Sequence, residues 1–230
     1  MKPLLTVPIR ASSPEAIERQ LRQRIPSVQA YEIWLDALPK KFLEPKIIGK
    51  LVSQWKKITK KKLIVVCKDK MEQGRFTGTK SQKANLLIAA AQAGVHYVDI
   101  GLQTNKKNIS TLMRQKGKTK LMVSFHDFKK TPTPPRLLQI IKQMKQTGAD
   151  IIKVATFVNT LEDTQNLIDL ALELKKKKQP HIIVGMGEKG IATRILGQKL
   201  GNELQFVTLE AQTAPGQLSL QESLAFQNVL

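Results

Sequence analysis

The 230-residue chain contains a single cysteine, Cys67. One cysteine excludes an internal disulfide framework and any metal site built from several thiolates. No apolar run approaches the roughly 18 residues that a membrane helix needs, and the apolar part of residues 1–10 is too short for a signal peptide. We therefore expect a protein of the reducing cytoplasm that makes no contact with a membrane.

Acidic and aromatic residues are also scarce. The chain has 18 Asp and Glu residues against 38 Lys and Arg residues, a formal net charge of +20, and only 5% Phe, Trp and Tyr. Such a charge raises the alternative of a module that binds nucleic acid. The lysines, however, gather in runs such as residues 175–178, where predicted helices end, and few aromatic residues interleave with them. Because a charge run is usually a solvated face, we favour a surface that attracts small anions over nucleic acid.

Apolar residues make up 41% of the chain and fall into eight short runs with amphipathic stretches between them. We predict strands at residues 4–9, 30–35, 63–67, 95–100, 121–125, 150–155, 181–185 and 206–209, and helices at residues 14–24, 44–57, 80–93, 105–116, 134–147, 160–175, 189–199 and 217–228. The strand runs are nearly continuous in apolar residues, which is typical of parallel strands covered on both faces. These units predict an α/β fold, a closed (β/α)8 TIM barrel that forms a single domain over residues 1–230. A doubly wound open sheet is the alternative, because strand count does not prove closure.

One lysine, Lys153, lies inside the apolar run 150–155 and not in a solvated stretch. Burial disfavours the charged form of an amine, so a buried lysine is costly unless the site uses it. A neutral lysine is a nucleophile that can form a Schiff base with a ketone or an aldehyde. The alternative is a strand-end lysine whose stem is buried while its ammonium group reaches solvent. This segment does not decide between the two.

In (β/α)8 barrels the active site lies at the C-terminal ends of the strands. The predicted strand ends place there the polar residues Glu32, Asp36, Lys68, Glu72, Asp99, His126, Asp127, Lys153, Arg194, Thr213 and Gln217. His126 ends the strand before that of Lys153, and an imidazole titrates near neutrality. A structural histidine is the commoner case, but the nearness of Lys153 favours a general acid/base.

Residues 185–190 match the pattern Gly-x-Gly-x-x-Gly between a predicted strand and a predicted helix. The same pattern opens a dinucleotide-binding unit. The chain after this segment is too short to complete a nucleotide-binding half-domain, so we expect no nucleotide, metal or other cofactor. We expect the glycine turn to suit a carboxylate or phosphate at a helix N-terminus.

Together these segments resemble type I 3-dehydroquinate dehydratase, a Schiff-base enzyme of the shikimate pathway to the aromatic amino acids. The resemblance rests on residues 31–36, 68–74, 98–100, 124–128, 150–155, 185–197 and 213–217, in order along the whole chain. Each segment alone is only modest evidence for the family. Seven segments in the same order, with a histidine and a lysine at the matching positions, are specific evidence for it. The resemblance implies a TIM barrel, a homodimer and a small anionic substrate, 3-dehydroquinate.

The resemblance also implies residue roles. Lys153 forms the imine with the substrate ketone, His126 acts as general acid/base, and Glu72 orients His126. The implied substrate-binding residues are Glu32, Lys68, Arg194, Thr213, Gln217, Met186 and Phe206.

Three positions depart from the family pattern. Where the family has Glu-x-Arg after the second strand, this chain has Trp34 in place of the arginine. Lys68 replaces an arginine after the third strand, and Gln73 replaces a glycine. Lysine has the positive charge of arginine but lacks its planar guanidinium with paired N–H donors, and tryptophan lacks both features. We therefore expect dehydratase chemistry with reduced catalytic efficiency.

Two alternatives stay open. Another Schiff-base lyase, such as a class I aldolase on the same barrel, uses the same lysine chemistry. A non-catalytic basic barrel that binds nucleic acid predicts strongly salt-dependent binding. The set of Glu72, His126 and Lys153 and the segment 213–217 favour the dehydratase over the aldolase, and a binding assay over a salt series would test for nucleic acid.

Overall fold

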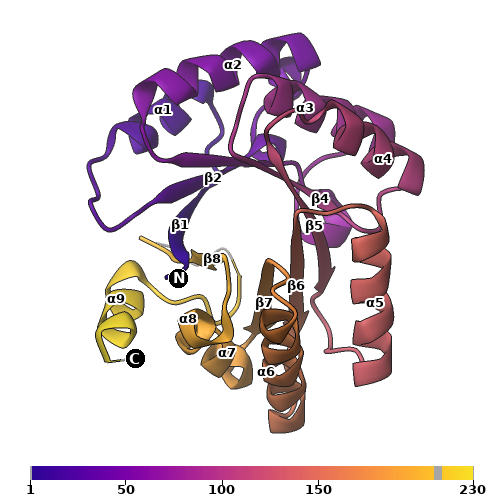
Figure 1. Ribbon diagram of the computed structural model, residues 1–230. Helices are drawn as coiled ribbons and strands as arrows, with labels where there is room; N and C mark the ends of the chain where they lie inside the picture. The colour runs from indigo at the N-terminus through magenta and orange to yellow at the C-terminus, as the bar shows by residue number, and fades with distance from the viewer. Residues whose placement is uncertain (1, 210–213, 230) are drawn as a thin grey trace.

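The computed structural model describes residues 2–209 and 214–229. Eight parallel strands form one sheet in the order β7-β6-β5-β4-β3-β2-β1-β8, and helices surround the sheet on its outer face (Figure 1). Strand β1 pairs with both β2 and β8, so the sheet curls round until the last strand meets the first. This is the predicted (β/α)8 TIM barrel, and the open-sheet alternative is wrong.

The strands and helices alternate along the chain. The strands are β1 (Leu4–Ile9), β2 (Ala30–Trp34), β3 (Lys62–Val66), β4 (Tyr97–Gly101), β5 (Lys120–Asp127), β6 (Ile151–Phe157), β7 (His181–Met186) and β8 (Leu204–Phe206). The helices are α1 (Pro14–Arg22), α2 (Pro45–Ile58), α3 (Lys80–Gln92), α4 (Lys106–Gln115), α5 (Pro134–Gln146), α6 (Leu161–Lys176), α7 (Ile191–Ile195), α8 (Gly197–Leu200) and α9 (Leu220–Val229). Within the described ranges, no helix is long and apolar enough to cross a membrane.

The last two units differ most from the sequence prediction. Strand β8 begins at Leu204, which pairs with Leu4, and ends where the predicted strand 206–209 begins. The predicted helix 189–199 is divided into α7 and α8. The predicted helix 217–228 begins only at Leu220, because the Ser219 hydroxyl accepts a hydrogen bond from the Glu222 amide at 3.2 Å and so caps α9.

Alternate residues of each strand pack into two separate apolar layers, because successive side chains of a strand point to opposite faces. Val65 and Val98 belong to the larger layer between the sheet and the helices. Their neighbours Ile64, Val66 and Tyr97 belong to a smaller layer that fills the barrel interior. This interior layer forms the floor beneath the C-terminal ends of the strands.

The junction between β7 and β8 is closed mainly by one side chain. The Asn202 amide accepts a hydrogen bond from the Ile183 N–H at 2.9 Å and donates one to the Ile183 carbonyl at 3.2 Å. Beside it, the Glu203 N–H donates to the His181 carbonyl at 2.9 Å. A side-chain amide therefore takes the place of a neighbouring peptide group at this seam.

Candidate active site

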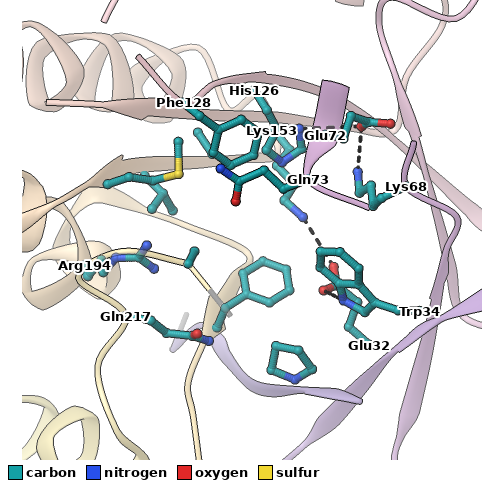
Figure 2. A pocket seen from close by; sticks show the side chains of 16 residues that line it. Glu32, Trp34, Lys68, Glu72, Gln73, His126, Phe128, Lys153, Arg194 and Gln217 are labelled. Carbon is teal, nitrogen blue, oxygen red and sulfur yellow. Dashed lines mark hydrogen bonds and ion pairs between the residues drawn. The ribbon is translucent and has the colours of Figure 1, made fainter. Parts of the chain in front are cut away.

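A pocket of about 650 Å³ opens at the C-terminal ends of the strands, and Figure 2 shows the side chains that line it. Among its lining residues are nine of the ten predicted site residues, Glu32, Lys68, Glu72, His126, Lys153, Met186, Arg194, Phe206 and Gln217. The tenth, Thr213, lies outside the described residues. The pocket brings charged, polar and apolar side chains together in one concave site, as is typical of sites for small molecules.

Lys153 points into the barrel from β6 and is only 7% exposed. Its Nζ atom lies 3.0 Å from Asp99 Oδ2, 3.3 Å from Glu32 Oε1 and 4.3 Å from the centre of the Phe206 ring. The solvent-reaching alternative for Lys153 is therefore wrong. Asp99, which the sequence predicts at the mouth without a role, contacts Lys153 directly.

Lys68 is buried at the end of β3 among acceptors from three other segments. Its Nζ atom lies 3.0 Å from Glu72 Oε1, 3.2 Å from Asp99 Oδ2 and 3.3 Å from Ser124 Oγ. Burial acts to lower the pKa of Lys68, but the carboxylates of Asp99 and Glu72 outweigh this effect and raise it. Lys68 therefore stays protonated and shares one Asp99 oxygen with Lys153.

A third buried lysine, Lys83 on α3, was not predicted from the sequence. It is 1% exposed and contacts two carboxylates, Glu72 and, at 3.2 Å, Asp69. Its neighbours Leu86 and Leu87 are buried on the same helix. A lysine in the midst of an apolar helix surface is the signal that could have pointed to it, because an unpaired buried charge is rarely tolerated.

Glu72 connects this cluster to the histidine. Burial acts to raise the pKa of Glu72, but the ammonium groups of Lys68 and Lys83 lower it to about 2. Glu72 Oε1 lies 3.7 Å from His126 Nδ1. At neutral pH an ionised carboxylate therefore faces the imidazole, but His126 Nδ1 has no hydrogen-bond partner among the described residues, and the orienting role of Glu72 stays a prediction.

The Glu72 segment depends on a tight turn after β3. A Cβ atom on Gly74 would lie 2.0 Å from the Lys68 carbonyl oxygen, so only glycine fits. Gln73, just before it, has a left-handed conformation with φ of 59°. A side chain in this region costs roughly 1–2 kcal/mol, which explains why glycine is the expected residue at position 73.

His126 lies on β5, two residues beyond Ser124, the residue in register with Lys153. The side chains of His126 and Lys153 both point into the pocket (Figure 2), and the register places His126 two residues nearer the C-terminal end of its strand. Burial is the main cause that lowers the pKa of His126 to about 3, and the ammonium groups of Lys68 and Lys153 add to it. At neutral pH the imidazole is uncharged and can accept a proton.

The opposite side of the pocket is mostly apolar. Val184, Met186 and Phe206 line it, and Arg194 projects from α7. Arg194 Nη2 lies 3.3 Å from the Pro215 carbonyl oxygen, while its buried Nε atom has no hydrogen-bond partner within the described part of the chain. Burial lowers the pKa of Arg194 to about 10, so the side chain remains a cation at neutral pH.

The glycines of residues 185–190 have a packing role. A Cβ atom on Gly190 would lie 2.5 Å from the Gly185 carbonyl carbon, so the turn after β7 brings backbone against backbone. The helix that follows, α7, has only five residues. The turn therefore gives no support to the predicted anion site at a helix N-terminus.

Fold and pocket together define a barrel enzyme built around a buried lysine. The family model for type I 3-dehydroquinase matches residues 5–228. The chain belongs to this family.

Individual relatives agree with the family match. The chain is 34% identical to the 3-dehydroquinate dehydratase of Methanocaldococcus jannaschii over 167 residues, which cover 71% of this chain and 74% of the relative. It is 30% identical to the enzyme of the same name from Desulfotalea psychrophila, with 91% and 89% covered. The crystal structure of the Clostridium difficile type I 3-dehydroquinate dehydratase has the same fold, with a TM-score of 0.91 at 22% identity over 99% of this chain and 92% of that one.

Proposed function

We propose that this chain dehydrates 3-dehydroquinate to 3-dehydroshikimate through an imine on Lys153. Membership of the type I family supports the reaction, a hydro-lyase step of the shikimate pathway. A class I aldolase would also use an imine, but the family match favours the dehydratase. The observation that carries the residue roles is the pairing of a buried lysine with an uncharged histidine in one pocket.

In the first step the Lys153 amine attacks the substrate ketone. The ammonium group must first lose a proton, since only the neutral amine is a nucleophile. The carboxylates of Asp99 and Glu32, at 3.0 and 3.3 Å, are in direct contact with this nitrogen and hold it in place. Loss of water from the adduct gives a protonated imine, a stronger electron sink than the ketone.

His126 then removes a proton from the carbon next to the imine. The imidazole suits this role because it is uncharged at neutral pH and faces the pocket. The imidazolium formed returns that proton to the departing β-hydroxyl group, which leaves as water. Hydrolysis of the conjugated imine releases the product and restores Lys153.

Arg194 is the proposed partner of the substrate carboxylate. It is a buried cation with a hydrogen-bond donor that has no partner in the described ranges, and a guanidinium binds a carboxylate through two parallel hydrogen bonds. Met186 and Phe206 would contact the apolar face of the ring. By resemblance, Glu32, Lys68, Thr213 and Gln217 would bind its polar groups.

Three expectations from the sequence stay predictions. These are the cytoplasmic location, the homodimer and the reduced catalytic efficiency that follows from Trp34 and Lys68. Sedimentation analysis and comparison of kcat/KM with that of the relatives would test the last two.

Borohydride trapping tests the proposal. Reduction in the presence of 3-dehydroquinate should add one ligand mass to the protein, and peptide mapping should locate the adduct on Lys153. The matched control is Lys68, a second buried lysine of the same pocket that three acceptors hold protonated. An adduct on Lys68, or none with an enzyme that binds substrate, contradicts the proposal.

A further inference from the structure

Arg10 lies just beyond the C-terminal end of β1 and contacts two residues that line the pocket. Its guanidinium carbon is 4.0 Å from the centre of the Trp34 ring, well within the range of a cation–π interaction. Its Nη2 atom donates a hydrogen bond to the Gln73 carbonyl at 3.1 Å. One exposed side chain thus connects the ends of three neighbouring strands at the pocket rim.

Both residues that Arg10 contacts are connected to residues of the proposed active site. The Trp34 Nε1–H donates a hydrogen bond to Glu32 Oε2 at 2.8 Å, and the other oxygen of Glu32 contacts Lys153 at 3.3 Å. Gln73 follows Glu72 directly and has a left-handed backbone conformation that glycine would adopt at lower cost. Arg10 therefore stacks on the ring that holds Glu32 and binds the carbonyl of the strained residue beside Glu72.

We propose that Arg10 is a positioning residue for the dehydratase reaction, which braces Trp34 and Gln73 and thereby fixes Glu32 for binding of an anionic polyhydroxy substrate. The proposal rests on the proposed function and adds a residue to it. Trp34 and Gln73 are also two of the three positions where the chain departs from the family pattern. Because Arg10 contacts both residues, the replacements at positions 34 and 73 are linked in space and do not affect the site independently of each other.

Arginine suits this task better than lysine. Its flat guanidinium can lie on an indole ring while its edge donates hydrogen bonds, which an ammonium group cannot do in the same way. Of its five N–H donors, one is used for Gln73 among the described residues, so others remain for an anion at the rim. The positive charge also stands on the β1–β2 side, where position 34 itself has none.

The first test compares Arg10→Gln with Arg24→Gln. Arg24 is also exposed and its replacement changes the net charge equally, but it lies between α1 and β2, at the opposite end of the barrel. We expect Arg10→Gln to raise KM for 3-dehydroquinate about tenfold, the size of one partly desolvated cation–π contact, with kcat within about twofold of the wild type. Arg10→Lys should restore part of the loss. Equal KM values for the two Gln variants overturn the proposal.

A second test asks whether Arg10 acts through Trp34. Trp34→Phe keeps an aromatic face for the guanidinium but removes the hydrogen bond to Glu32, and Trp34→Ala removes both. Adding Arg10→Gln should leave KM within about twofold in both variants, because each has already lost the Trp34–Glu32 hydrogen bond through which Arg10 acts and coupled residues are not additive. A full tenfold increase on top of Trp34→Ala contradicts the proposed route through Trp34.

Adduct formation separates this proposal from the proposed function. Borohydride should trap the Lys153 adduct in every Arg10 and Trp34 variant that gives a wild-type circular dichroism spectrum. If the wild type itself forms no adduct and shows no turnover, the proposed function fails. If the wild type turns over and Arg10→Gln matches Arg24→Gln, only the positioning role of Arg10 fails.

Discussion

The two sides of the pocket treat buried charge in opposite ways. One side, which we call the charged wall, consists of Glu32, Lys68, Glu72, Asp99 and Lys153. There each cation lies within 3.3 Å of at least one carboxylate oxygen. The other side, the apolar wall, consists of Val184, Met186 and Phe206 together with Arg194, which lies across the pocket from Lys68 (Figure 2).

The two walls differ in where their buried charges find partners. A buried charge is tolerated where partners compensate it, and the charged wall supplies these partners from its own residues. The Arg194 guanidinium has only a backbone carbonyl as its hydrogen-bond partner in the part of the chain that the structure describes. Within the described ranges the cations of the charged wall are paired by its own carboxylates, whereas Arg194 has no carboxylate partner there, as its proposed role in binding the substrate carboxylate would require.

Removing the nucleophile from the charged wall should have the largest effect. Lys153→Met should abolish both turnover and the borohydride adduct, because Lys68, the other amine of the wall, is held protonated by three acceptors. Mass spectrometry after reduction with 3-dehydroquinate measures the adduct, and a circular dichroism spectrum verifies the fold. Turnover that persists in this variant would remove Lys153 from the mechanism.

His126→Ala should rank second. Loss of a general acid/base lowers the rate by about 10²–10⁴-fold, while Lys153 and its carboxylate partners stay in place. Imine formation should therefore remain detectable by borohydride trapping as kcat collapses. A variant with nearly unchanged kcat would make His126 a structural residue.

Arg194→Ala should give the opposite kinetic pattern, since it changes the apolar wall. A hydrogen bond to a charged group contributes about 1.5–3 kcal/mol, so KM should rise roughly 10- to 100-fold with a much smaller change in kcat. Arg136→Ala, at an exposed position on α5, is the matched control. If kcat falls by a larger factor than KM rises, the proposed difference between the two walls is contradicted.

The burial of His126 beside the charged wall should also make the free energy of unfolding depend on pH. The pKa of His126 is lowered to about 3 in the folded protein, so below pH 6.5 the unfolded chain binds a proton that the folded chain does not. The free energy of unfolding should therefore fall as pH drops from 6.5 towards 3. His126→Gln should flatten this part of a urea-denaturation series, and an unchanged slope would assign the effect to other groups.

The smallest expected effect is that of Lys83→Met. Glu72 loses one of its two ammonium partners but keeps Lys68 at 3.0 Å, so we expect kcat to fall only about 3- to 10-fold, below the loss typical of a residue that supports a site from outside it. Lys80→Met removes an exposed lysine from the same helix and should leave kcat unchanged. Equal kcat values for the two variants would show that Lys83 has no influence on the site.

The fold could be predicted from the sequence wherever an apolar run was long enough. Strands β1 to β7 overlap the predicted runs closely, because their residues are buried on both faces and read as continuous apolar stretches. Strand β8 has only three residues, and its start at Leu204 depends on pairing with Leu4 at the other end of the chain. No local pattern contains that information.

The site could be predicted as a set of strand-end residues but not as a set of contacts. Periodicity and resemblance pointed to Lys153, His126 and Glu72. They could not show that Asp99 is shared by two lysines, because this contact joins β3, β4 and β6. Arg10 gave no signal at all, since an exposed arginine after a strand is unremarkable until its neighbours in space are known.

The pairing of β1 with β8 has a consequence for the nascent chain. Leu4 and Leu204 are partners, and a ribosome that adds about 5–20 residues per second needs roughly 10–40 s to synthesise the chain between them. For that time one edge of β1 lacks its partner, and an unpaired edge can recruit strands of other chains. The net charge of +20 opposes such encounters, because like-charged chains repel one another. Synthesis of β8 supplies the partner that covers this edge of β1.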